Sequence, residues 1–220
     1  MSAKFIPYSK DTYSELEIVA RSIEHFHYMD KRRTVRDFAP KPIPKQVIEK
    51  IIMTASTAPS GAHKQPWTFC VVTNPELKSK IRFAAEKEEF ELYSNKISDE
   101  WREDLSYLGT DANKPFLEIA PALIIVFKKS YDIDSDKKRT NYYVQESVGI
   151  ACGFLLEAIH YCGLVALTHT PSPMNFLINL LNRPENEKPF LLIPIGYPVE
   201  STLVPDLCRK DKKDIIVYYK

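Results

Sequence analysis

Six consecutive apolar residues at positions 122–127 (ALIIVF) leave no polar face for water, so they predict a strand that is buried on both sides. Further strands are predicted at residues 67–73, 164–168 and 190–195. Apolar residues at helical spacing predict helices at residues 11–29, 42–55, 141–162 and 174–181, and another that begins at Pro75 and continues past Tyr93. Strands separated by helices indicate an α/β or α+β domain around one sheet.

Two polar stretches interrupt this pattern. Residues 94–118 show no clear period and are predicted to be irregular. Residues 132–139 are predicted to form a solvated, charged loop. The total of 220 residues suits one globular unit, so we expect a single domain over residues 1–220.

The charge balance and the glycines exclude several classes of function. The chain has 30 Lys and Arg against 29 Asp and Glu, and this near-neutral total gives no global field to attract nucleic acid or an anionic membrane. Its six glycines form neither a G-x-G-x-x-G fingerprint nor a P-loop. A bound phosphate would therefore need side-chain cations or a helix terminus.

The cysteines and apolar segments indicate a soluble protein of a reducing compartment. The four cysteines form no C-x-x-C motif, and neither they nor the histidines show a metal-ligand spacing, so no metal site is expected. Residues 1–10 lack the apolar core of a signal peptide. Residues 148–167 carry Glu157 and His160, which favours a buried helix running into a strand over a membrane span. We expect a cytoplasmic location.

The first candidate binding segment is RRTVR at residues 32–36, in which three guanidinium groups accompany one hydroxyl. Such a segment is suited to holding a phosphate or a planar anion. If it is extended, alternation places Arg32, Thr34 and Arg36 on one side and Arg33 on the other. A solvated basic turn is the competing interpretation.

The second candidate is the loop at residues 58–67 (APSGAHKQPW), between a helix and a strand. Gly61 and two prolines shape its backbone, so its amides are able to face a ligand. Ser60 does not lie in a G-x-S-x-G elbow, and a serine nucleophile is not expected. A plain connecting loop is the alternative.

Two further groups carry polar chemistry. Glu89 and Tyr93 are four residues apart on one predicted helix face, and together with Lys114 they suit an amino-acid zwitterion; a solvated surface is the alternative. Thr168, His169 and Thr170 follow a buried strand at its carboxyl end, where ligands collect in α/β sheets. A purely structural strand exit is the other interpretation.

In this order along the chain, the segments resemble the nitroreductase-like flavoprotein superfamily and, within it, the iodotyrosine deiodinase family. The resemblance is carried by RRTVR, TAPSGAHKQPWTF, the helix with Glu89 and Tyr93, Lys114, IACGFLLEAI, GLVALTHTP, NRPENEKP, IPIGYP and VPDLCRK. The first and last blocks occur loosely across nitroreductases. APSGAH followed by Glu89, Tyr93 and Lys114 is much more specific to deiodinases.

The resemblance implies FMN as the cofactor. It assigns these residues to FMN: Arg32, Arg33, Thr34, Arg36, Ser60, Gly61, Thr168, His169, Thr170 and Arg209. Thr170 takes the place of a threonine whose hydroxyl approaches flavin N5, which gives it a catalytic role. Thr34 stands where the family more often has serine, and His169 replaces a threonine common in vertebrate members.

The resemblance also implies the substrate contacts and the fold. The backbone of Ala62 would face the phenolate oxygen, while Glu89, Tyr93 and Lys114 would bind the amino-acid end and order an active-site lid at about residues 86–116. The implied fold is α+β, with a central, mainly antiparallel sheet flanked by helices. It forms an intertwined homodimer with FMN at the interface, and the helix with Gly149 and Gly153 has a potential dimer role.

The implied function is FMN-dependent reductive dehalogenation of mono- and diiodotyrosine by a soluble member without a membrane anchor. Electrons would come from NADPH directly or through a separate reductase. A general NAD(P)H-dependent nitroreductase is the nearest alternative, because it would share the flavin site but not the lid. A non-catalytic module that binds flavin or tyrosine derivatives is the alternative from another class.

Overall fold

The computed structural model describes residues 3–95, 98–135 and 137–220, and the chain divides into two compact units, Met1–Arg32 and Arg33–Lys220. The first unit contains helix α1 (Glu15–Asp30). Its start is fixed by a capping box, in which the Ser14 backbone N–H donates to Glu17 at 2.8 Å and the Glu17 N–H donates to the Ser14 hydroxyl at 3.4 Å. Four apolar side chains at helical spacing are each more than half exposed: Leu16, Val19, Ile23 and Phe26.

The second unit is built around a five-stranded sheet. Its strands are β1 (Phe38–Ala39), β2 (Trp67–Val72), β3 (Ala122–Lys129), β6 (Val165–Ala166) and β7 (Glu187–Pro198). The order is β1-β7-β3-β2, with β6 also paired to β7, and all of these pairs are antiparallel. The predicted α+β class with a mainly antiparallel sheet is therefore confirmed.

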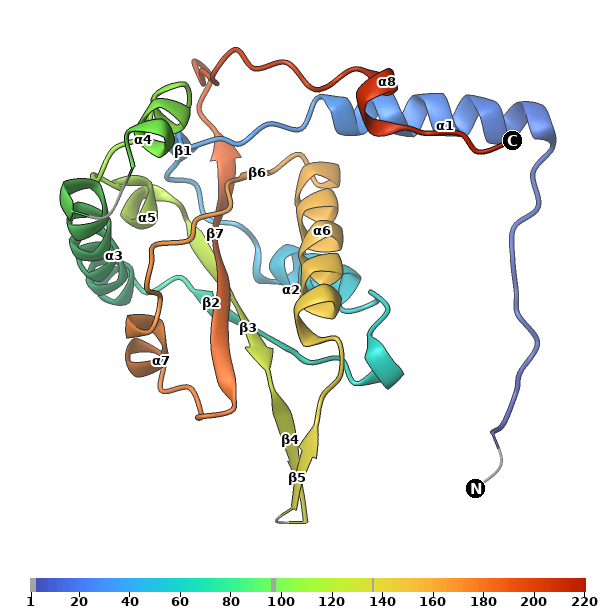
Figure 1. The fold of residues 1–220 in the computed structure, drawn as a ribbon, viewed down its shortest axis with the longest axis horizontal. Helices are drawn as coiled ribbons and strands as arrows, with labels where there is room; N and C mark the ends of the chain where they lie inside the picture. Colours follow the sequence, from blue (N-terminus) through green and yellow to red (C-terminus); the bar gives the residue numbers. More distant parts are fainter. Residues whose placement is uncertain (1–2, 96–97, 136) are drawn as a thin grey trace. The chain divides into compact units, whose positions relative to one another are not determined.

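Helices cover both faces of this sheet (Figure 1). On one face lie α2 (Lys45–Ala55) and α6 (Val144–Tyr161), and on the other lie α3 (Pro75–Asn95), α5 (Phe116–Ile119) and α7 (Phe176–Leu180). The remaining helices are α4 (Asp99–Ser106), α8 (Lys212–Ile215) and the short 3-10 helix η1 (Gly61–His63). No helix formed by the described residues is long and apolar enough to cross a membrane.

The apolar run predicted as a buried strand forms the centre of the sheet. In β3, Ala122, Ile124 and Val126 enter the core shared with α2 and α6. Their neighbours Leu123, Ile125 and Phe127 enter the second core, with α3, α5 and α7. All six are 1% exposed or less, because successive side chains point to opposite faces and both faces are covered.

Two polar stretches are more regular than predicted. The prediction of a loop at residues 132–139 is wrong, because β4 (Tyr131–Asp134) and β5 (Lys137–Thr140) form a hairpin. Residue 136, between the two strands, lies outside the described residues. Arg139 pairs with Asp134 at 2.8 Å across the two strands. The expected irregular stretch at residues 94–118 contains α4 and α5, although residues 96–97 of this stretch are not among those described.

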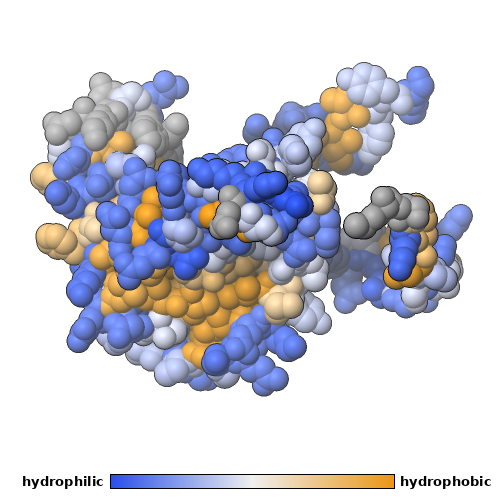
Figure 2. Space-filling model, turned by 90° about the horizontal axis from the view of Figure 1, so that it is seen from below, coloured by the Kyte–Doolittle hydropathy of each residue, from blue (hydrophilic) through white to orange (hydrophobic). Residues whose placement is uncertain are grey.

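Apolar surface remains uncovered on the second unit. Figure 2 shows a continuous apolar area on the face seen from the β4–β5 end. On α6, Ile150 and Phe154 are 44% and 39% exposed. A Cβ atom added at the neighbouring Gly149 or Gly153 would meet nothing within 4 Å. An apolar area of this kind is typical of a surface that another protein covers.

Candidate functional site

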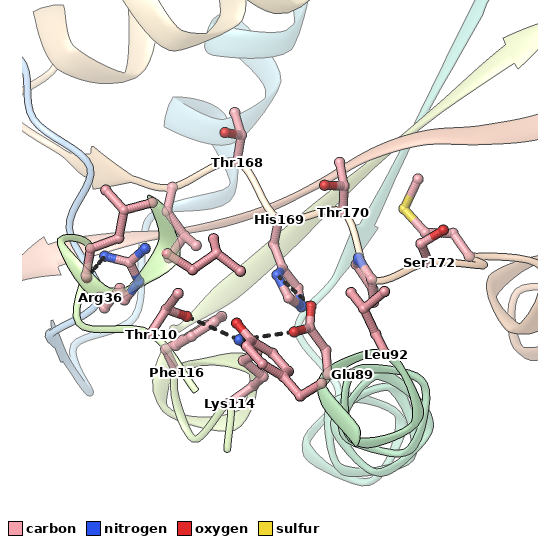
Figure 3. A pocket seen from close by; sticks show the side chains of 16 residues that line it. Arg36, Glu89, Leu92, Thr110, Lys114, Phe116, Thr168, His169, Thr170 and Ser172 are labelled. Carbon is pink, nitrogen blue, oxygen red and sulfur yellow. Dashed lines mark hydrogen bonds and ion pairs between the residues drawn. The ribbon is translucent and has the colours of Figure 1, made fainter. Parts of the chain in front are cut away.

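A cavity of about 540 Å³ opens on the α3–α5–α7 side of the sheet (Figure 3). Its walls come from α3, from residues 105–116 and from the chain that follows β6. It brings together seven residues that the sequence singled out: Arg36, Glu89, Tyr93, Lys114, Thr168, His169 and Thr170. Cavities that combine apolar walls with a few convergent polar groups are the usual binding sites for small molecules.

Glu89 and Lys114 form a buried ion pair in this cavity. The Lys114 Nζ lies 3.3 Å from Glu89 Oε2, and the two side chains are only 3% (Lys114) and 8% (Glu89) exposed. The same ammonium donates to the Thr110 hydroxyl at 3.1 Å and lies 5.7 Å from the centre of the Tyr93 ring. Burial raises the pKa of Glu89, and the Lys114 charge opposes that rise. The cavity therefore presents a carboxylate, an ammonium and a phenol close together.

A second network fixes the backbone of Lys114. Its N–H donates to Glu86 Oε1 at 2.7 Å, and that oxygen also accepts from Arg82 Nε at 2.7 Å. The Arg82 guanidinium reaches further to Asn113 Oδ1 at 2.9 Å and to Glu118 Oε2 at 3.1 Å. Arg82 thus joins α3 to α5 and to the residue before Lys114.

In the segment that follows β6, successive side chains point in opposite directions. His169 exchanges two backbone hydrogen bonds with Leu192 of β7, at 2.8 and 3.0 Å. Its side chain points toward Glu89 and is 8% exposed, whereas Thr168 and Thr170 point the other way (Figure 3). This is the alternation of an extended strand, and it leaves the two threonine hydroxyls exposed on one side.

The RRTVR segment runs beside β6. Thr34 bridges Ala166 in parallel, and the Val35 N–H donates to the Ala166 carbonyl at 3.2 Å. Val35 is buried, which leaves Arg36 at the edge of the cavity, where its guanidinium reaches the Leu108 carbonyl at 3.5 Å. Burial lowers the pKa of the half-buried Arg36.

An adjoining hollow of about 400 Å³ shares Arg36 with the cavity and is also lined by Thr34 and Pro205. The Arg33 guanidinium donates to the Pro205 carbonyl. Arg209 is exposed in the segment that follows β7. Arg32 ends the first unit, where its backbone N–H donates to Met29 at 3.1 Å.

The loop at residues 58–67 is tightly shaped, but it lies away from the cavity. It sits beside α6, on the opposite face of the sheet (Figure 1). A Cβ at Gly61 would come within 2.7 Å of the Tyr142 carbonyl, and Ala62 and His63 adopt left-handed φ values of 49° and 54°. The Ser60 hydroxyl accepts from the Gln65 N–H at 2.9 Å. Within one chain, Ser60, Gly61 and Ala62 do not line the cavity.

The sequence interpretation missed several cavity residues. Thr110 and the apolar wall formed by Leu92, Leu105, Leu108, Phe116 and Met174 carry no motif that marks them. The Arg82–Glu86 pair was also missed, but it has the i, i+4 spacing of a helical ion pair, and that spacing could have identified it.

Comparison with known proteins defines the class. The sequence matches the nitroreductase family over residues 29–197, so the chain belongs to the nitroreductase family. A nitroreductase with bound FMN from Bacteroides fragilis has the same fold, with a TM-score of 0.65 at 21% identity over 89% of this chain and 99% of that one.

Closer relatives place the chain with the iodotyrosine deiodinases of that family. It is 64% identical to the iodotyrosine deiodinase of Haliscomenobacter hydrossis, over 98% of this chain and 97% of the relative. It is 43% identical to iodotyrosine deiodinase 1 of Homo sapiens, over 98% of this chain and 75% of the relative. A crystal structure of oxidized iodotyrosine deiodinase bound to FMN and 3-iodo-L-tyrosine matches with a TM-score of 0.78 at 31% identity, over 89% of this chain and 98% of that one.

Proposed function

We propose that this protein is an FMN-dependent oxidoreductase that removes halide reductively from halogenated tyrosines. The observation that carries the proposal is the buried Glu89–Lys114 pair, which offers both charges needed by an amino-acid zwitterion in one cavity. The related iodotyrosine deiodinase whose crystal structure matches this fold binds FMN and 3-iodo-L-tyrosine. The net reaction takes two electrons and one proton, breaks the carbon–iodine bond, and gives tyrosine and iodide.

The ion pair recognises the substrate by exchanging partners. The substrate ammonium would take Lys114's place at Glu89, and the substrate carboxylate would pair with Lys114. Tyr93, beside them, would donate a hydrogen bond from its hydroxyl. Each buried charge keeps an opposite charge throughout, so binding avoids the large cost of an unpaired buried ion. These contacts hold the amino-acid end and thereby orient the halogenated ring.

The residues beside the cavity suit FMN. Arg36 is a half-buried cation. Among the described residues it makes only a long hydrogen bond to a backbone carbonyl, and no carboxylate forms an ion pair with it. It would bind the phosphate end together with Arg32, Arg33, Thr34 and Arg209. Ser60, Gly61, Thr168, His169 (through its backbone) and Thr170 would line the ring system. When bound, FMN supplies the electrons for the reaction, and the chain supplies position, electrostatics and exclusion of water.

The Thr170 hydroxyl is proposed as the catalytic contact to the flavin ring. Thr170 is exposed, and its side chain points away from the Glu89–Lys114 pair, on the same side of the segment as Thr168 (Figure 3). In this position it would hold a hydrogen bond to the ring edge while Glu89 and Lys114 hold the substrate.

A homodimer would complete the site. Ser60, Gly61 and Ala62 lie on the opposite face of the sheet from the cavity of their own chain, so we infer that they reach the cavity of a second copy. The exposed face of α6 around Gly149 and Gly153 would let that copy approach closely. The uncovered apolar stripe of α1 gives the second copy further surface to bury.

A lid at about residues 86–116 would close over the bound substrate. Glu89 lies near its start and Lys114 near its end, so pairing both with one zwitterion ties the two ends together. The Arg82 network fixes the base of the lid. Electrons would reach FMN from NADPH or from a separate reductase.

Anaerobic reduction of the FMN-loaded protein by dithionite in the presence of diiodotyrosine tests the function. We expect release of two iodide ions per diiodotyrosine and formation of tyrosine. Rapid NADPH-dependent nitro reduction without iodide release would support a general nitroreductase instead. A yellow protein that releases no iodide and reduces no nitro compound would support a non-catalytic binding module.

Mixed dimers test the shared site. Gly61→Val damages the loop, because a Cβ there meets the Tyr142 carbonyl, and Lys114→Met damages the cavity. Iodotyrosine is kept well below its wild-type dissociation constant, so that each variant alone has little activity. If one copy supplies the loop and the other the cavity, a refolded mixture of the two impaired variants regains one intact site per mixed dimer. About a quarter of wild-type activity is then expected from random pairing. A mixture no more active than the two variants alone would show that each site is built by one chain.

A further inference from the structure

His169 occupies a position that neither the ion pair nor the proposed flavin contacts explain. Its side chain is 8% exposed, and its Nδ1 lies 4.0 Å from Glu89 Oε1. The other carboxylate oxygen of Glu89, Oε2, is the one that pairs with Lys114. The ring packs edge-on against Phe116, with centres 5.6 Å apart and an interplanar angle of 89°. Its Nε2 is buried and has no hydrogen-bond partner among the described residues.

The imidazole is neutral at any physiological pH. Burial, with the nearby Lys114 and Arg36 charges, lowers the pKa of His169 to about 3. A neutral imidazole carries one N–H, and a lone pair directed at the Glu89 carboxylate would be repelled. The tautomer with the proton on Nδ1, facing Glu89, is therefore favoured.

The three groups differ in what holds them. Glu89 and Lys114 belong to the proposed lid, whereas His169 is fixed to β7 by two backbone hydrogen bonds. In the free protein the 4.0 Å between Nδ1 and Glu89 Oε1 is too long for a hydrogen bond. When Lys114 turns to the substrate carboxylate and the lid closes, Glu89 would move about 1 Å closer to His169 and accept a hydrogen bond from it. A cation at this position would compete with the substrate ammonium for Glu89, but a neutral donor does not.

We propose that His169 is a positioning residue, which orients the Glu89 carboxylate toward the substrate ammonium through its Nδ1–H and so determines the preference for ligands that carry an amino group. This inference rests on the proposed function of the cavity. Its effect passes through Glu89, so it should appear only with ligands that bear the ammonium.

Two variants and two ligands test the proposal on the FMN-loaded protein. His169→Phe removes both ring nitrogens but keeps an aromatic ring against Phe116. His169→Asn places an amide N–H close to the position of Nδ1. The ligands are 3-iodotyrosine and 3-(4-hydroxy-3-iodophenyl)propionate, which lacks only the amino group. Dissociation constants are measured from the quenching of flavin fluorescence.

We expect His169→Phe to weaken iodotyrosine binding about tenfold, which corresponds to about 1.4 kcal/mol. The propionate should bind this variant within about twofold of wild type, and His169→Asn should restore most of the affinity for iodotyrosine. Equal losses for both ligands, or no loss, would overturn the role of His169. Failure of the wild-type protein itself to bind iodotyrosine would overturn the proposed function as well, and that outcome is distinct from the other two.

Discussion

Replacing Lys114 by methionine keeps an unbranched side chain as far as the Cε position and removes the ammonium from a site where Lys114 is 3% exposed. In the free protein, Glu89 then loses the partner at 3.3 Å that opposes the effect of burial on its pKa. The pKa of Glu89 rises further, and the carboxyl takes up a proton at a higher pH than in the wild type. The substrate carboxylate, in turn, loses its cation.

The magnitude follows from these contacts. A hydrogen bond to a charged group contributes about 1.5–3 kcal/mol, which corresponds to a loss of roughly ten- to hundredfold in affinity. The wild-type protein must separate Lys114 from Glu89 before it binds substrate. The free energy of breaking that ion pair offsets part of what Lys114 contributes to binding, so its removal costs less. We therefore expect iodotyrosine to bind Lys114→Met about tenfold more weakly, toward the lower end of the range.

The assay is titration of the FMN-loaded variant with iodotyrosine, followed by flavin fluorescence. Lys87→Met is the matched control, since Lys87 is exposed on α3 and lies outside the lining of the cavity. FMN binding should be unchanged in both variants. 2-Iodophenol, which has no amino-acid end, should bind both equally. An unchanged affinity for iodotyrosine, or an equal loss for iodotyrosine and iodophenol, would refute the assignment of Lys114 to the substrate carboxylate.

Three further changes have defined outcomes. Arg82→Met should raise the dissociation constant for iodotyrosine about fivefold without releasing FMN, because it loosens the backbone of Lys114 through one charged hydrogen-bond network; an unchanged constant would show that the network is not needed. Thr170→Ala should slow iodide release more than nitro reduction, and equal losses in the two assays would contradict its catalytic role. Glu187→Gln should lower the free energy of unfolding by about 2 kcal/mol at pH 7, because Glu187 is 3% exposed and accepts from Arg183 and Thr68. Burial, which would raise the pKa of Glu187, is outweighed by these hydrogen bonds, so its pKa is lowered. The difference between variant and wild type in urea unfolding should therefore be present above pH 4.5 and shrink as the pH falls through the lowered pKa; a difference that does not change with pH would contradict this.

The sequence predicts the sheet and its main helices because their residues repeat at the periods that burial requires. The six apolar residues of β3 and the helical spacing of Ile48 and Ile51 in α2 are local signals, and the structure confirms both elements. The β4–β5 hairpin was missed because its residues are charged, and its stability comes from pairs across the strands. One such pair, between Arg139 and Asp134, becomes visible only when the two strands are side by side.

The site was predictable only in part for a related reason. Motifs identified Glu89, Lys114 and the residues from Thr168 to Thr170, which the structure brings into one cavity although they are far apart in the chain. The apolar wall, such as Leu108 and Phe116, has no local pattern, because its membership depends on how α3 and the following segment pack. The separation of Ser60 from the cavity also depends on which face of the sheet each loop reaches.

The ion pair has a consequence for how the protein responds to ionic strength. Glu89 and Lys114 together carry no net charge, and neither does the amino-acid end of the substrate that would bind them. Salt screens charges over about 8 Å at physiological concentration, but it acts weakly on buried pairs, and here one buried pair would be exchanged for others. Halotyrosine affinity should therefore change little between dilute buffer and molar salt. The arginines that would hold a phosphate attract a true anion, and the cofactor should be the ligand that high salt releases.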